Sequence, residues 1–129
     1  MWCPWRASIE RGVVVVENCQ LPPGVKGVTD GLGIVYLSAA LRTEIDRRCT
    51  LTHELIHIER RHIGAQPAAV ERAVRLETAR RLIPEWLFVD GVAWSPYVNE
   101  LAEYWHVTPA VATDRIAAAR LEGGAGACS

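Results

Sequence analysis

The residues of this chain whose types and spacing could do chemistry lie near its middle, in the segment Thr-Leu-Thr-His-Glu-Leu-Ile-His at 50–57. His53 and His57 are four residues apart, so on a helix both imidazoles lie on one face, about 6 Å apart, and can reach one Zn²⁺ ion. Glu54 lies about 100° further round the helix, where it can contact a zinc-bound water without being a ligand. The spacing predicts a hydrolytic zinc site in which Glu54 is the general base.

The alternative is an ordinary amphipathic helix that carries two histidines by coincidence. The HExxH motif is specific only when it falls on a helix. Apolar residues flank it at Leu55, Ile56 and Ile58, and no glycine or proline interrupts residues 43–63. The context therefore favours the zinc site.

Catalytic zinc normally takes three protein ligands, so a third is required. The long metzincin motif would place a histidine at position 63, which is Ile63 here. His62 is five residues past His57 and would point elsewhere on the helix, so we expect it in solvent beside Arg60 and Arg61. A carboxylate from the next helix is the remaining choice.

Two glutamates on that next helix are candidates. At 100° per residue, Glu71 falls in one stripe with Val74 and Leu82, which should turn toward the interior. Glu77 lies about 120° away, with Arg81 four residues later, in the order that favours an exposed ion pair. An inward carboxylate without an evident partner needs a cation. We therefore prefer Glu71 to Glu77 as the third ligand.

The elements around these residues begin with strands. A β-branched segment at 12–22 and the segment Ile-Val-Tyr-Leu-Ser at 34–38 predict two strands, and Asp30-Gly31 lies in the glycine-rich turn between them. Such a turn suggests an antiparallel pair within 12–38. Residues 1–12 have no clear period and could hide a further strand.

The hydrophobic period changes to 3.6 from about residue 46. One helix is predicted from Asp46, as its cap, to Gly64, and a second from about Pro67 to Ile83, ended by Pro84. The active-site helices thus span about 46–84. Strands followed by helices indicate an α+β fold.

Near the C-terminus, residues 98–121 have the spacing of a helix-turn-helix, with a break before Pro109. The functional interpretation is DNA binding, with Arg115 and Arg120 contacting phosphates. Asp114 and Glu122 offset those arginines, so little phosphate neutralisation is available. The alternative is a pair that packs under the core or docks a protein, and the charge count favours it over DNA.

Composition limits the class of protein. A chain of 129 residues, half of them hydrophobic and with a net charge of −1, is expected to form one soluble domain over 1–129. No apolar run of about 20 residues and no secretory leader is present, so neither membrane nor secretion is expected. Four scattered cysteines suggest a reducing, cytoplasmic location; they are Cys3, Cys19, Cys49 and Cys128.

The segment 50–57 after a strand, with the second helix Val-Glu-Arg-Ala-Val-Arg-Leu-Glu-Thr-Ala-Arg-Arg-Leu-Ile-Pro at 70–84, resembles the ImmA/IrrE family of zinc metallopeptidases, especially the short forms of phages and mobile elements. His53, Glu54 and His57 match the family's HExxH, and Glu71 matches its glutamate-bearing helix. The family's usual second acid and phenylalanine are absent from that helix.

The resemblance implies a small zincin-like domain that binds Zn²⁺ and cleaves an intracellular transcriptional regulator, often a helix-turn-helix repressor. Such enzymes hold an extended substrate at a sheet edge, and we assign this role to Ile34, Val35 and Tyr36. The alternative for these residues is a core strand. A proton donor for the oxyanion is also expected; the candidates are Tyr36, Tyr97, Tyr104 and His106.

A second hypothesis comes from another class of protein. The chain would be a non-catalytic regulatory module with a structural or vestigial metal site, binding DNA or a protein through 98–121. The presence of Glu54 favours the enzyme, since a structural site needs no carboxylate there.

Overall fold

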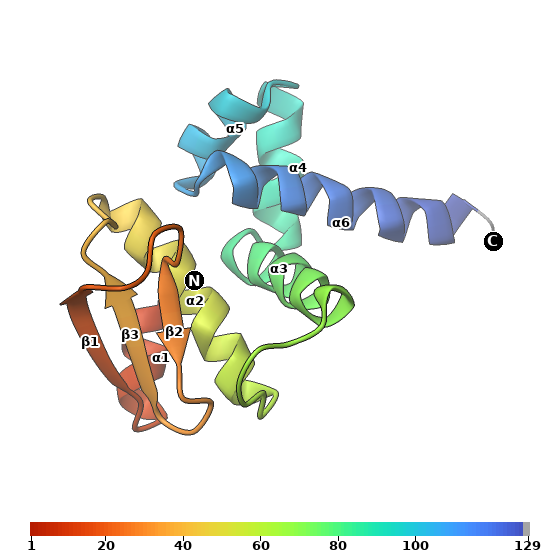
Figure 1. Ribbon diagram of the computed structural model, residues 1–129. Helices are drawn as coiled ribbons and strands as arrows, with labels where there is room; N and C mark the ends of the chain where they lie inside the picture. The colour runs from red at the N-terminus through yellow and green to blue at the C-terminus, as the bar shows by residue number, and fades with distance from the viewer. Residues whose placement is uncertain (128–129) are drawn as a thin grey trace. The chain divides into compact units, whose positions relative to one another are not determined.

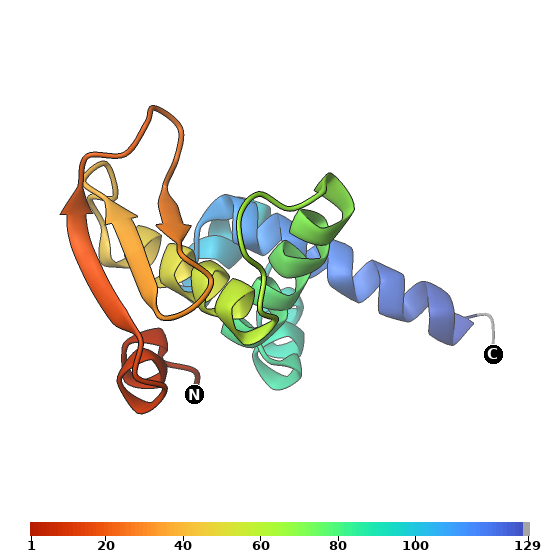
Figure 2. The same cartoon turned by 60° about the horizontal axis from the view of Figure 1, so that its bottom comes forward.

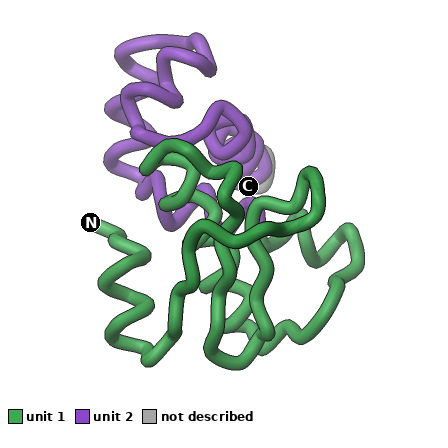
Figure 3. The backbone as a smooth tube through the Cα atoms, turned by 60° about the vertical axis from the view of Figure 1, so that its left-hand side comes forward, with its two compact units in different colours: residues 1–74 green, residues 75–129 purple. Residues whose placement is uncertain are grey.

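A computed structural model describes residues 1–127, with side chains through residue 123. Within these residues the chain forms three strands and six helices, which confirms the α+β class. It divides into two compact units, Met1–Val74 and Arg75–Ser129 (Figure 3). We call them the N-terminal and C-terminal units. Two such units can belong to one folding domain, so a single domain over 1–129 stays a prediction.

The described elements follow one another without long gaps (Figure 1). In chain order they are α1 (Pro4–Glu10), β1 (Val14–Cys19), β2 (Gly27–Thr29), β3 (Ile34–Ser38), α2 (Glu44–Glu59), α3 (Ala68–Leu82), α4 (Glu85–Trp94), α5 (Val98–Trp105) and α6 (Pro109–Ala127). No helix among the described residues is both long enough and apolar enough to cross a membrane.

The sheet of the N-terminal unit has the order β1-β3-β2. Strand β1 pairs with β3 in parallel and β2 pairs with β3 antiparallel, so Tyr36 has Val16 on one side and Val28 on the other. The predicted antiparallel pair between 12–22 and 34–38 is therefore wrong. The intervening segment, expected to be all turn, holds β2, which takes the antiparallel place beside β3.

The turn at Asp30-Gly31 is present, and it joins β2 to β3. The Asp30 carboxylate accepts hydrogen bonds from three successive backbone N–H groups, including that of Gly33 at 2.8 Å. These bonds lower the pKa of Asp30. A short polar side chain that bonds its own turn explains why Asp is favoured at this position.

Residues 1–12 form a helix where we considered a further strand. Pro4 stands at the start of α1, where a proline costs no backbone hydrogen bond. Two indole N–H groups attach this end of the chain to α2: Trp2 donates to the Thr52 hydroxyl at 2.9 Å, and Trp5 donates to Glu44 at 3.0 Å. The helix thus supports the element that carries the HExxH motif.

Helix α2 begins three residues earlier than predicted and ends before Gly64. Thr43 is its N-cap, and its hydroxyl accepts from the Asp46 N–H at 3.0 Å. Asp46 therefore lies inside the first turn, where its negative charge is favourable. The helix ends at Glu59, and Arg61 takes the left-handed conformation (φ 59°) that a glycine would ordinarily supply.

The core of the N-terminal unit lies between β3 and α2. Val35 and Leu37 are fully buried and share one cluster with Leu51 and Leu55. Because side chains alternate along a strand, Tyr36 lies on the opposite face of the sheet, where it is 36% exposed.

The C-terminal unit is helical, and α5 and α6 form the predicted helix pair around residues 106–108. Helix α6 continues to Ala127, beyond the expected end near 121; Cys128 lies outside the described residues. Trp105 is buried, and its indole N–H donates to the Leu87 carbonyl at 2.9 Å. Gly91 leaves the space for that indole ring.

Candidate metal centre

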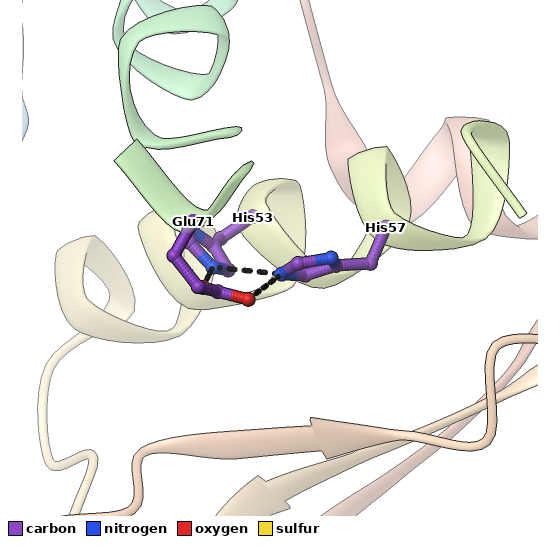
Figure 4. A group of neighbouring side chains, drawn as sticks. All are labelled: His53, His57 and Glu71. Atoms are coloured by element: carbon purple, nitrogen blue, oxygen red, sulfur yellow. Dashed lines mark hydrogen bonds and ion pairs between the residues drawn. The ribbon is translucent and has the colours of Figure 1, made fainter. Parts of the chain in front are cut away.

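Helix α2 presents both histidines of the motif to one point, as its four-residue spacing requires. The Nε2 atoms of His53 and His57 lie 3.2 Å apart (Figure 4). His57 is buried and His53 partly buried. Burial of the neighbouring residues Leu51, Leu55 and Ile56 fixes the rotation of the helix and hence the direction of both imidazoles.

Glu71, from the first turn of α3, completes the group. Its carboxylate oxygens lie 3.0 Å from His57 Nε2 and 3.4 Å from His53 Nε2 (Figure 4). Val74 and Leu82 of the predicted inward stripe are buried, but the Glu71 side chain is 36% exposed and that of Glu77 is 27% exposed, so the predicted contrast in their burial is absent. The structure thus brings together the three side chains that the sequence analysis proposed as ligands.

The separations of these atoms fit a metal ion. A tetrahedral site with ligand distances of about 2.0–2.1 Å places neighbouring ligand atoms about 3.3 Å apart. The observed separations are 3.0, 3.2 and 3.4 Å. His53 contacts one Glu71 oxygen and His57 contacts the other, so the two imidazoles and the carboxylate face one another and could hold a metal ion.

Glu77, the competing candidate, makes ion pairs with arginines. Its carboxylate contacts Arg81 at 3.1 Å, four residues later on α3, and Arg80 at 4.0 Å. The His-His-Glu group found among the described residues includes Glu71 and not Glu77. The predicted ion pair of Glu77 with Arg81 is thus present.

Glu54 is buried beside this group, with 9% of its surface exposed. Burial raises the pKa of Glu54 to about 7, and the charge of Glu71 adds to the rise. A general base is most effective when its pKa lies near the working pH. A Cβ built on Gly27 would lie 3.3 Å from Glu54 Cγ, so strand β2 runs directly beside this residue.

Burial also lowers the pKa of His57, against an opposing effect of the Glu71 carboxylate. A lowered pKa favours the neutral imidazole at neutral pH. The neutral form is the one that binds a metal ion.

The helical projection predicted that His62 points into solvent, and this prediction is wrong. Its Nδ1 lies 3.0 Å from His57 Nδ1, and it is only partly exposed. The projection failed because α2 ends at Glu59, so the angle of 100° per residue no longer applies at position 62. The chain reversal depends on the left-handed conformation of Arg61. An arginine side chain does not predict this conformation.

Ile34, Val35 and Tyr36 do not form the sheet edge on which their predicted role in substrate binding was based. These residues lie on β3, the central strand, and β1 and β2 pair with it on both sides. The side chain of Val35 is in the core, and Tyr36 lies on the sheet face opposite α2, which also removes it as an oxyanion donor. Within the described residues, the strand edges left unpaired belong to β1 and β2.

The other oxyanion candidates belong to the C-terminal unit. Tyr97 and Tyr104 are exposed there, and the Tyr104 hydroxyl donates to Asp90. His106 takes a left-handed conformation just after α5. Their role in the chemistry stays a prediction.

Arg115, which the less favoured DNA-binding interpretation would place against phosphates, is 2% exposed. Its Nε donates to the Ile83 carbonyl at 2.7 Å, its Nη2 contacts Glu85 at 3.2 Å, and its guanidinium lies 4.4 Å from the centre of the Phe88 ring. This assignment is therefore wrong, because the inward face of α6 includes position 115. Arg120 remains exposed.

The centre is thus a His-His-Glu group with a buried glutamate beside it, all within the N-terminal unit. A scan against protein-family models, a search of curated proteins and a search of solved structures each found no match to this chain.

Proposed function

We propose that this protein is a zinc-dependent endopeptidase with a zincin-like fold that hydrolyses a peptide bond of an intracellular protein. His53, His57 and Glu71 are the ligands and Glu54 is the general base. The resemblance to the ImmA/IrrE family supports a helix-turn-helix repressor as the substrate. The observation that carries the proposal is the convergence of two imidazole nitrogens and one carboxylate at 3.0–3.4 Å beside a buried glutamate.

The residues divide the chemistry between them. Zinc, when bound, supplies a Lewis acid that polarises the substrate carbonyl and lowers the pKa of water to about 7. Glu54 takes a proton from the attacking water and gives it to the leaving amine. In the metal-free protein burial raises the pKa of Glu54 to about 7, so its carboxylate has a high affinity for a proton.

The substrate backbone pairs with the edge of β2. This strand passes beside Glu54, because Gly27 lies close to both Glu54 and Thr50. Among the described strands it lies at an edge of the sheet and pairs with β3 alone. A peptide added there as a further strand would be held by main-chain hydrogen bonds next to the general base.

The test is the zinc content of the purified protein and three variants. We expect about one zinc per chain in the wild type, and loss of zinc in His53→Ala and Glu71→Ala. Glu77→Ala is the matched control, because it removes a glutamate from the same helix that pairs with arginines instead. It should keep its zinc.

Zinc retained in Glu71→Ala and lost in Glu77→Ala would reassign the third ligand. No zinc in any sample, even after metal is added, would contradict the enzyme and favour a binding module in which 98–121 docks a protein or DNA.

A further inference from the structure

The chain reverses direction at the end of α2 and returns beside His57. The His62 N–H donates to the His57 carbonyl at 2.9 Å, and the Arg61 N–H donates to the Ile58 carbonyl at 3.0 Å. With Arg61 in the left-handed conformation, these bonds form a Schellman motif. The motif places position 62 back over the last turn of the helix.

A second element holds this segment in place. Gly31, in the turn between β2 and β3, is buried and has a positive φ of 76°. A Cβ at this position would overlap the His62 carbonyl oxygen and lie 3.0 Å from Ile63 Cγ1. The turn and the end of α2 therefore pack against each other, and both views of the N-terminal unit show them at the same end of it (Figure 1 and Figure 2).

The two ring nitrogens of His57 have different neighbours. Nε2 faces His53 and Glu71, and Nδ1 lies 3.0 Å from His62 Nδ1. A neutral imidazole carries one N–H, and the other nitrogen is an acceptor. If Nδ1 carries the hydrogen, it donates to His62, and the lone pair of Nε2 is left for the metal centre.

We propose that His62 is a positioning residue that accepts the Nδ1–H hydrogen bond of His57 and thereby fixes the tautomer whose Nε2 serves as a metal ligand. The inference rests on the proposed function, since it assigns a role toward the same centre. His62 is not itself a ligand, because its contact is with the nitrogen on the far side of the His57 ring. Its own ring hydrogen lies on Nε2.

Partners of this kind matter for metal binding. A hydrogen bond to the second ring nitrogen fixes the orientation of a ligating histidine and raises its basicity, and losing such a partner typically costs about 10–100-fold in metal affinity. That partner is usually a carboxylate, a carbonyl or water. In this chain it is a histidine held by a backbone motif and a glycine turn.

The experiment compares the zinc affinity of four full-length proteins by competition with a chromophoric chelator. His62→Ala should bind zinc about 10–100-fold more weakly than the wild type. His62→Asn should recover most of the affinity, because its amide oxygen is at the same number of bonds from Cβ as His62 Nδ1. His106→Ala, which removes another histidine just after a helix, is the control and should bind like the wild type.

The tautomer of His57 in the metal-free protein provides the second readout, from long-range proton–nitrogen NMR spectra. Without metal, the Glu71 carboxylate 3.0 Å from Nε2 favours the other tautomer. We therefore expect a larger share of the Nδ1–H form in the wild type and in His62→Asn than in His62→Ala. Wild-type zinc affinity in His62→Ala, no recovery in His62→Asn, or an unchanged tautomer in His62→Ala would each overturn the inference. A wild type that binds no zinc would overturn the proposed function instead, and the NMR result would still decide the role of His62.

Discussion

The N-terminal and C-terminal units both bury polar side chains, but they use them differently. In the N-terminal unit, His53, His57 and Glu71 direct their ligand atoms at one another within 3.4 Å. In the C-terminal unit, the buried Arg115 is distributed over separate partners, namely the Ile83 carbonyl, Glu85 and the Phe88 ring. The first arrangement could hold a cation. In the second, the cation is the Arg115 guanidinium itself.

This difference shows what separates a group of side chains that could hold a metal ion from one that supports the fold. HExxH and the helix-turn-helix spacing are comparable as patterns, because each sets which side chains share a helix face. The two patterns differ in the contacts that their polar atoms make in the folded protein. Buried donors with protein partners stabilise a fold, and partly buried acceptors that converge on one point favour a cation or a proton between them.

The largest effect is expected from Glu54→Gln, measured as the rate of cleavage of a repressor substrate. The rate should fall by about 100–10,000-fold, because the amide cannot take a proton from water. Zinc content should stay at the wild-type value, since Glu54 is not a ligand. Zinc lost together with activity would instead make Glu54 part of the metal-binding group.

The same variant tests the burial of Glu54 through the pH dependence of the free energy of unfolding of the metal-free protein. Glu54 has a pKa of about 7 in the folded protein and an ordinary value of 4.5. The folded protein therefore binds this proton more tightly than the unfolded chain. The resulting contribution to the free energy of unfolding is fully present below pH 4.5 and is lost as the pH rises through 7. Glutamine does not titrate, so above pH 7 Glu54→Gln should be more stable than the wild type by roughly 3 kcal/mol, at about 1.4 kcal/mol per pKa unit.

Chemical denaturation at pH 5 and pH 8 measures this difference. If the two proteins differ in free energy of unfolding by the same amount at both pH values, Glu54 ionises as it would at a solvated site.

Arg115→Ala should destabilise the C-terminal unit by about 2–3 kcal/mol, because it leaves a buried carbonyl without its donor and removes the guanidinium from the Phe88 ring. Arg120→Ala, an exposed arginine on the same helix, is the control and should change stability by less than about 0.5 kcal/mol. Denaturation monitored by tryptophan fluorescence gives both values. Zinc affinity should be unchanged in each, and a loss of zinc with Arg115→Ala would contradict the separate roles of the two units.

Gly91→Ala and Gly123→Ala form a pair on helices of the C-terminal unit. A Cβ at Gly91 would lie 2.7 Å from Trp105 Cε2, so we expect a loss of about 1–3 kcal/mol from overpacking. Gly123 has open space around it, and alanine there should stabilise by about 0.5–1 kcal/mol through helix propensity. The midpoint of thermal unfolding should therefore fall in Gly91→Ala and rise in Gly123→Ala. A rise in both would show that the Trp105 ring does not lie against Gly91.

The sequence predicted the group at the centre because its members follow local rules. His53 and His57 share a face by spacing, and Glu71 follows from the inward stripe of its own helix. Glu77 was assigned to an ion pair with Arg81 by the same rule, and the pair is present. Each of these inferences needs only one helix and its period.

The errors concern contacts between distant segments. Strand β2 has three residues, too few for a periodic signal, and its insertion made the pairing of β1 with β3 parallel and removed Ile34, Val35 and Tyr36 from any edge. The burial of Arg115 was not predicted, because a helical pattern does not show whether a long cationic side chain can reach a carbonyl 32 residues away.

By itself, the sequence determined the α+β class, the helix with the HExxH residues and the glutamate helix that follows, since hydrophobic periodicity and spacing are properties of short segments. Only the tertiary structure decided which strand lies at the edge beside Glu54, which arginine is buried, and that His62 meets His57. These depend on chain reversals at single residues, such as Arg61 and Gly31, and on packing between segments that are far apart in the chain. A short segment of sequence predicts neither the chain reversals nor the packing.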